Sequence, residues 1–191
     1  MGVNLLSHQM IMDSAKELID DWLLSFAILG NQFMRPKVGA KFKLAKKHYE
    51  TLTDIFGNVV VIDKFKEYEE VLKKDLSVEQ KDLFGLFDLL FNGGTMEHVE
   101  NQREGWRNAH YFIKEGGIAI HVCPLLGGWP DHGQFLYDHE FFDRLTSANS
   151  YRVITQQIVE HKKGKAIYIS FQKIKAGAFM WKPCENLVLS A

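Results

Sequence analysis

Two short apolar stretches that enclose a helical segment constrain the fold of this chain more than any other feature. Leu86–Phe91 and Ile118–Val122 are predicted to be buried strands, and Asn101–Lys114 between them has a helical pattern. Strand–helix–strand units build parallel sheets, in which ligands collect at the carboxyl ends of the strands. Polar residues follow both strands, at Asn92–His98 and Cys123–Gly133. We therefore expect these two polar segments to line one cleft.

The rest of the chain alternates between predicted helices and strands and then ends in an antiparallel pair. Helices are predicted at Ser7–Trp22, Lys37–Ile55 and Tyr137–Ser147. Strands are predicted at Leu23–Leu29, Val59–Ile62, Tyr151–Glu160 and Lys165–Phe171. Gly116-Gly117 is expected to form a turn, the charged segment Lys64–Lys74 to be helical or irregular, and Gly177–Ala191 gives few signals. This order predicts an α/β protein with a mostly parallel central sheet and a C-terminal antiparallel hairpin.

Composition limits the classes of partner. The length of 191 residues fits a single domain over residues 1–191, with an N-terminal helix within 1–22 and a C-terminal extension over 172–191. The net charge of −1 gives no general attraction to nucleic acid or to a membrane. Cys123 and Cys184 lack CxxC spacing, which favours reduced thiols, and no apolar run has transmembrane length. We expect a soluble, cytoplasmic protein with no nucleic-acid or membrane partner.

Three short motifs point to a family. They are Gly93-Gly94-Thr95-Met96-Glu97-His98-Val99, Lys114-Glu115-Gly116-Gly117 and Asp131-His132-Gly133-Gln134-Phe135. Their content and order resemble class I S-adenosylmethionine-dependent methyltransferases, in particular the branch with a GGTxEHVxN element after the fourth strand. The resemblance is strong over Leu86–Asn149 and weaker back to Phe26. It implies a Rossmann-like fold with helices on both faces, S-adenosylmethionine as cofactor, and methyl transfer to oxygen or nitrogen of a small molecule or glycan.

The resemblance also implies a set of cofactor contacts. The set comprises Gly30, Asn31, Gln32, Asp63, Lys64, Asp75, Leu76, Asn92, Gly93 and Gly94. In the family, the loop after the first strand contacts the methionine part of the cofactor, the acid ending the second strand holds the ribose, and an Asp after the third meets the adenine. The family's first loop usually has two or three glycines, whereas this chain keeps only Gly30, so the Asn31 and Gln32 side chains would bind the carboxylate.

Each of these residues also has a plainer interpretation. Asp63 ends a buried strand, and a carboxylate there can accept two ribose hydroxyl hydrogen bonds, but it could equally be a solvated turn residue. Asp75 could cap the next helix, Gly30 could be a turn glycine, and Gly93-Gly94 could be a simple loop.

Histidines supply the candidate catalytic groups. His98 and His132 are the candidates for a base that removes a proton from the methyl acceptor, with Glu97 beside His98. Alternatively, His98 orders the loop and Glu97 is an acid at a helix start. His121 is expected to be packed within its strand. Glu97, His98, His121 and His132 follow separate strand ends and could converge, but they lack a short HxH or HExxH pattern, so no metal site is predicted.

Three questions stay open at this level. Trp129, Phe135 and Tyr137 follow the strand predicted at Ile118–Val122 and could either contact a substrate or belong to the core. The glycine-poor loop at Gly30 also allows a non-catalytic relative of the fold that only binds or scaffolds. The segment Gly177–Ala191 could pack on the domain or on a second subunit, so a homodimer is possible.

Overall fold

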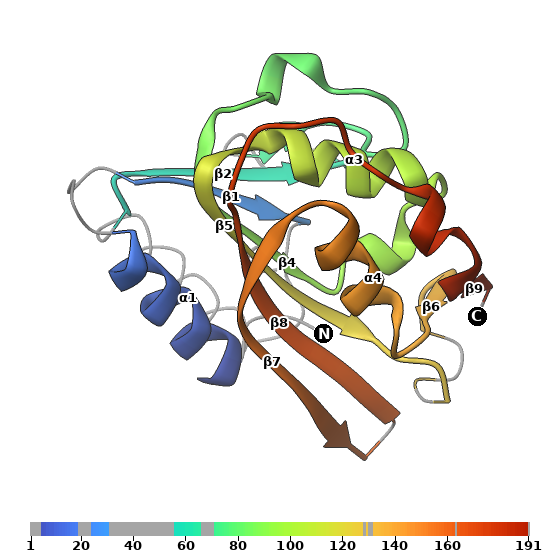
Figure 1. Cartoon of the computed structure of the whole chain (residues 1–191). Coiled ribbons are helices and arrows are strands. Elements are labelled where there is room, and N and C mark those ends of the chain that lie inside the picture. Colours follow the sequence, from blue (N-terminus) through green and yellow to red (C-terminus); the bar gives the residue numbers. More distant parts are fainter. Residues whose placement is uncertain are drawn as a thin grey trace.

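A seven-stranded mixed sheet with helices on both faces forms the centre of the structure (Figure 1). This computed structural model describes residues 5–18, 24–30, 56–65, 71–127, 129, 132–162 and 164–190. Its helices are α1 (Leu5–Glu17), α3 (Gln102–Phe112) and α4 (Phe141–Ala148), with 3-10 turns η1 (Lys81–Leu83), η2 (Met96–His98) and η3 (Lys182–Leu187). Its strands are β1 (Ser25–Leu29), β2 (Asn58–Asp63), β3 (Val71–Lys73), β4 (Phe87–Gly93), β5 (Ile113–Pro124), β6 (Phe135–Tyr137), β7 (Tyr151–His161), β8 (Gly164–Lys173) and β9 (Val188–Ser190).

The strand order explains where a ligand can bind. The sheet runs β3-β2-β1-β4-β5-β8-β7, and the strands from β3 to β5 are parallel. The chain moves outward from β1 to β3 and then returns to place β4 on the other side of β1. Such a reversal leaves a crevice at the carboxyl ends of the two central strands. The hairpin β7–β8 pairs antiparallel and β8 is antiparallel to β5, which confirms the predicted mixed α/β sheet.

Alternating side chains of the central strands build two cores. Phe26 and Ile28 of β1 face the core that includes Met10 and Ile11 of α1. Ala27 and Leu29 face the opposite core, which contains residues of α3 and α4. Because β1 is buried on both faces, its sequence is a continuous apolar run rather than an alternating one. No helix among the described ranges is long and apolar enough to cross a membrane.

Several boundaries differ from the sequence predictions. Val71–Lys73 is the strand β3, within the segment expected to be helical or irregular, and it pairs with β2. Gly116-Gly117 lies within the bounds of β5, at an irregularity where Ile113 pairs with Phe87 and Ile118 with Leu89, and Gly116 has a φ of 81°. A Cβ atom on Gly117 would lie 2.9 Å from the Asp88 carbonyl oxygen, so close strand packing explains this glycine.

The C-terminal third also contains elements that the sequence did not reveal. Tyr137 ends the strand β6 instead of starting a helix, and α4 begins only at Phe141. The last described strand, β9, pairs antiparallel with β6 in a small second sheet. The N-terminal helix was predicted to extend to Trp22 but ends at Glu17, with residues 19–23 outside the described part. The helix predicted at Lys37–Ile55 also lies outside the described residues.

Candidate functional site

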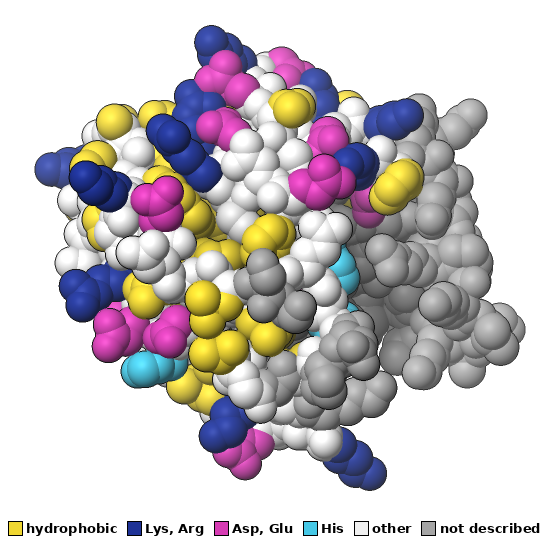
Figure 2. Space-filling view, turned by 90° about the vertical axis from the view of Figure 1, so that its right-hand side faces the viewer, with side chains coloured by type: hydrophobic (Ala, Val, Ile, Leu, Met, Phe, Trp, Pro, Cys, Tyr) yellow, Lys and Arg dark blue, Asp and Glu magenta, His cyan; other side chains and the backbone are white. Residues whose placement is uncertain are grey.

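A cavity of about 490 Å³ opens at the carboxyl ends of β1, β2 and β4. Its wall consists of Gly30, Ile62, Asp63, Lys64, Phe65, Lys74, Asp75, Leu76, Ser77, Gly94, Thr95, His98, Val99, Glu100, His132 and Gln134. This volume lies within the range of small-molecule and cofactor sites. The arrows of β1 and β2 point to the right in Figure 1, and Figure 2 shows that side, where histidine side chains reach the surface near hydrophobic ones.

Most of the predicted cofactor contacts lie in this wall. The residues found there are Gly30, Asp63, Lys64, Asp75, Leu76 and Gly94. Asn31 and Gln32 lie outside the described residues. The predicted contacts Asn92 and Gly93 are not in the wall and are buried. Of the three candidate catalytic residues, His98 and His132 line the cavity, whereas Glu97 lies behind it with no exposed surface.

Asp63 and Asp75 place two carboxylates on the same side of the cavity. Asp63 ends β2, and its Oδ1 accepts a hydrogen bond from the backbone N–H of Phe65 at 2.9 Å. Asp75 Oδ1 accepts the backbone N–H of Ser77 at 2.9 Å, and Asp75 Oδ2 lies 3.1 Å from Lys64 Nζ. The Ser77 hydrogen bond, aided by Lys64, lowers the pKa of the Asp75 carboxyl below its ordinary value. The Asp75 side chain is therefore an ionised acceptor at neutral pH.

Two glycines and a threonine shape the crevice between β1 and β4. Gly30 and Gly94 have φ angles of 79° and 89°, a region that residues with a Cβ rarely adopt. The Gly30 N–H donates to the Ile62 carbonyl at 2.7 Å, which ties the end of β1 to β2. The Thr95 hydroxyl donates to the Leu29 carbonyl at 2.7 Å and so connects the loop after β4 to β1. The two positive φ angles and these two hydrogen bonds thus fix the shape of the crevice.

Asn92 has a structural role instead of the predicted ligand contact. Its Oδ1 accepts the backbone N–H groups of Thr95 and Met96 at 3.0 and 3.1 Å. Its Nδ2 donates to Cys123 Sγ and faces His121 Nδ1, both at 3.3 Å. The side chain is fully buried, so it fixes the loop that carries Thr95 and leaves no polar atom for a ligand.

Four other residues considered from the sequence are not part of the cavity wall: His121, Trp129, Phe135 and Tyr137. His121 is packed between Trp106 and Phe171, as predicted, and burial lowers its pKa to about 3. Tyr137 is fully buried and belongs to the core. The Trp129 indole N–H donates to the Lys165 carbonyl at 2.9 Å.

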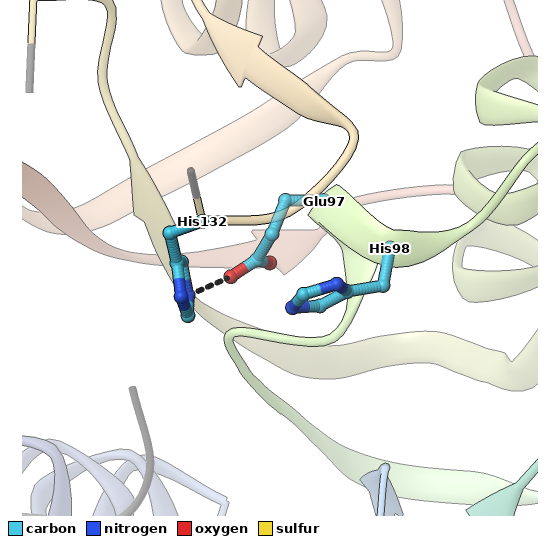
Figure 3. A group of neighbouring side chains, drawn as sticks. All are labelled: Glu97, His98 and His132. Atoms are coloured by element: carbon cyan, nitrogen blue, oxygen red, sulfur yellow. Dashed lines mark ion pairs between the residues drawn. The ribbon is translucent and has the colours of Figure 1, made fainter. Parts of the chain in front are cut away.

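Glu97, His98 and His132 form a cluster on the inner side of the cavity (Figure 3). One ligand atom from each side chain can be chosen so that all three lie within 4.8 Å of one another. Glu97 Oε1 lies 3.5 Å from His132 Nε2. Neither carboxylate oxygen of Glu97 accepts a hydrogen bond from the residues that the structure describes. His121, the fourth candidate for convergence, lies instead in the aromatic core beside Trp106.

Sequence reasoning missed several residues of the wall. Thr95 and Gln134 belong to the motifs that carry the family resemblance, which is the signal that could have identified them. Phe65 and Ser77 each follow a predicted carboxylate by two residues and donate a backbone N–H to it. A carboxylate followed by such a turn is a common local pattern, so these positions could have been inferred from the chain itself.

Comparisons with known proteins identify the fold. No family model matches the sequence, and no curated protein matches it. Among solved structures, the N-methyltransferase NodS from Bradyrhizobium japonicum in complex with S-adenosylhomocysteine matches with a TM-score of 0.58 and 12% identity, over 90% of this chain and 89% of that one. A Burkholderia thailandensis 1,6-didemethyltoxoflavin-N1-methyltransferase, with bound 1,6-didemethyltoxoflavin and S-adenosylhomocysteine, matches with a TM-score of 0.55 and 12% identity, over 87% and 78% of the two chains.

The same fold also occurs in a protein described by another activity. The [4+2]-cyclase SpnF matches with a TM-score of 0.60 and 11% identity, over 88% of this chain and 82% of that one. The chain therefore has the Rossmann-like fold of S-adenosylmethionine-dependent methyltransferases, as predicted. Identities this low describe the fold alone, so activity has to be argued from the residues of the site.

Proposed function

We propose that this protein is an S-adenosylmethionine-dependent methyltransferase that acts on oxygen or nitrogen of a small molecule or glycan. One observation carries the proposal: the cavity lies at the reversal point of the sheet, and Gly30, Asp63, Asp75 and Gly94 all contribute to its wall. These residues come from the ends of β1, β2, β3 and β4. Ligands of this fold class bind at that edge.

The residues present suit the adenosyl part of the cofactor. Asp63 can accept hydrogen bonds from both ribose hydroxyls, and Asp75 can accept one from the adenine amino group. Because Gly30 and Gly94 lack a Cβ, their backbone can approach the ligand closely. The bound cofactor would supply an electrophilic methyl group on a sulfonium centre. The main contribution of the protein would be to hold the acceptor in line with that group, which lowers the barrier by several kcal/mol, on the order of 7 or more in favourable cases.

The acceptor would lie beside the histidines. His98 and His132 both line the cavity, and either imidazole can take a proton from an acceptor hydroxyl or ammonium group. A base in this position contributes roughly 10²–10⁴ in rate. The Glu97 carboxylate lies behind His132, with its Oε1 3.5 Å from the Nε2 atom of that ring.

Calorimetric titration with S-adenosylhomocysteine and S-adenosylmethionine tests the cofactor site. We expect both to bind, and we expect Asp63→Asn to weaken binding by roughly 10- to 100-fold, because the variant loses charge-assisted hydrogen bonds worth about 1.5–3 kcal/mol each. Asp82→Asn is the matched control, since the Asp82 side chain is 58% exposed and lies outside the cavity wall. Absence of binding by the wild-type protein at high micromolar concentration, or equal affinity in the Asp63→Asn variant, would contradict the proposal.

A further inference from the structure

Glu97 is the only Asp or Glu side chain among the described residues that is fully buried, and its surroundings do not compensate its charge. Both carboxylate oxygens are shielded from solvent and neither accepts a hydrogen bond within the described part of the chain. A buried carboxylate is costly unless a cation or hydrogen-bond donors face it. The His132 ring at 3.5 Å reaches only Oε1, and at that distance it does not form a hydrogen bond.

The conformation of the loop after β5 places His132 beside this carboxylate. Gly133 has a φ of 85°, and a Cβ added to it would lie 2.8 Å from Glu97 Cγ. The next residue, Gln134, donates its backbone N–H to the Glu97 carbonyl at 2.8 Å. A glycine at position 133 therefore lets the loop pass directly over Glu97 and fixes the imidazole beside it.

His98 completes the cluster from the other side. It follows Glu97 in η2, and its ring lies 5.4 Å from that of His132 with an interplanar angle of 79°. Gln102 holds η2 in place, because its Nε2 donates to the Met96 and Val99 carbonyls, both at 2.7 Å. Figure 3 shows the Glu97 carboxylate between the two imidazole rings.

We propose that Glu97, His98 and His132 bind a divalent transition-metal ion at the inner wall of the cavity. Two imidazoles and one carboxylate form a common ligand set for Zn²⁺, Fe²⁺ and related ions, and here η2 supplies Glu97 and His98 while the loop after β5 supplies His132. Their ligand atoms lie within 4.8 Å of one another, and Glu97 Oε1 and His132 Nε2 are 3.5 Å apart. About 3.3 Å separates ligands around a tetrahedral zinc ion, so binding requires the longest of these distances to shorten by at most about 1.5 Å.

An ion bound by these three side chains would lie at the wall of the cavity. The carboxylate lies behind the cavity wall, while both histidines are part of the wall. Three protein ligands leave at least one coordination position for water or for an oxygen of a bound molecule. This position would face the cavity. A histidine that binds the ion no longer has a free ring nitrogen to act as the base of the proposed function, and metal-bound water would then take that role. The metal site does not require that the cavity bind S-adenosylmethionine.

Cobalt(II) titration of the chelator-treated full chain tests the proposal directly. We expect one Co²⁺ ion per chain, with visible d–d absorption bands that Zn²⁺ displaces. Glu97→Gln and His132→Gln should each weaken Co²⁺ binding by about 100-fold or more, because each removes one of three ligands. His139→Gln is the matched control, since the His139 side chain is 72% exposed and lies outside the cluster.

Thermal unfolding separates a metal site from a simple Glu97–His132 ion pair. In chelator, Glu97→Gln should melt above the wild type, because it removes an uncompensated buried charge. With Zn²⁺ at about a hundredfold excess over Kd, the wild-type Tm should rise by roughly 5–10 °C and the variant should not respond. An ion pair alone predicts the opposite: Glu97→Gln is destabilised in chelator, and Zn²⁺ shifts neither protein.

Three results would overturn the metal proposal. The first is no uptake of Co²⁺ or Zn²⁺ by the wild type, and the second is uptake that is equal in the wild type and both variants. The third is a Glu97→Gln variant that melts below the wild type in chelator, together with no effect of Zn²⁺ on the Tm of either protein. Titration of the chelator-treated protein with S-adenosylhomocysteine is run in parallel. Its outcome judges the proposed function separately from the metal site.

Discussion

His121 is expected to make the protein sensitive to mild acid, and the structure gives the size of the effect. Asn92 Oδ1 accepts two backbone N–H groups, which fixes the orientation of the amide so that its nitrogen faces His121 Nδ1 at 3.3 Å. An amide nitrogen only donates, so Nδ1 must be the acceptor and the neutral ring carries its proton on Nε2. Protonation of Nδ1 would place two donors against each other inside an aromatic core.

Burial lowers the pKa of His121 from its ordinary value of 6.5 to about 3. Because the folded pKa is depressed, the unfolded chain takes up the proton first, and stability is lost as the pH falls from about 6.5 towards 3. The cost approaches about 1.36 kcal/mol per pH unit once the unfolded histidine is fully protonated, so the loss between about pH 6.5 and about pH 4.5 is about 2.3 kcal/mol.

The assay compares urea unfolding of the wild type and His121→Asn across this pH window. The Asn side chain keeps an acceptor for Asn92 but does not titrate, so its packing cost is the same at every pH. We expect the wild type to lose about 2.3 kcal/mol relative to the variant as the pH falls from about 6.5 to about 4.5. His139→Asn, at an exposed position, should change this difference far less. Parallel curves for wild type and His121→Asn would refute the reasoning, whatever their vertical offset.

The remaining predictions concern the loop after β4 and the core beneath it. Asn92→Ala should lower the free energy of unfolding by about 3 kcal/mol, since the part-buried N–H of Thr95 and the buried N–H of Met96 lose their acceptor. A free energy of unfolding within about 0.5 kcal/mol of the wild type in a urea titration would contradict this. Gly94→Ala forces a φ of 89° on a residue with a Cβ and should destabilise by about 1–2 kcal/mol and weaken S-adenosylhomocysteine binding in calorimetry; unchanged affinity would remove Gly94 from the site. Tyr137→Phe should cost only about 1 kcal/mol in thermal unfolding, because its hydroxyl partner Gln102 still accepts from an indole N–H, and a loss above about 3 kcal/mol would point to a wider role.

The central strands could be predicted from sequence because burial on both faces requires a run of apolar residues. Strands with both faces covered are continuous apolar runs, and β1, β2, β4 and β5 were located in this way within a few residues, apart from an earlier start of β5 at Ile113. The three-residue strands could not be found. In β3 only Val71 is buried, and β6 pairs with β9 from the far end of the chain, so neither has a local pattern.

The position of the candidate site can be predicted as far as it depends on strand ends. Asp63 ends β2 and Asp75 lies two residues after β3, so the parallel topology alone places them at one edge. Asn92 shows the limit of this reasoning. A polar residue at a strand end can contact a ligand or satisfy the backbone of the following loop, and only the three-dimensional structure distinguishes the two roles.

The cluster around Glu97 could not be read from spacing, because it depends on how one loop packs against another. The contact requires the positive φ of Gly133 and the hydrogen bond from Gln134, neither of which leaves a short metal-binding motif in the sequence. What the sequence did contain was the pair of motifs that meet there. Each was recognised separately, and the fold brings them together.

Lys173 and Glu97 are both buried, but they differ in whether hydrogen bonds satisfy their side chains. Lys173 is 5% exposed, and its Nζ donates to the carbonyls of His110 and Ile113 at 2.9 and 3.0 Å. The backbone therefore compensates the lysine inside the core. Glu97 is more deeply buried and has no such compensation from the described residues, yet it lies directly behind the histidines of the cavity wall. Because an unsatisfied buried carboxylate is costly, the partner of Glu97 is expected to enter from the cavity.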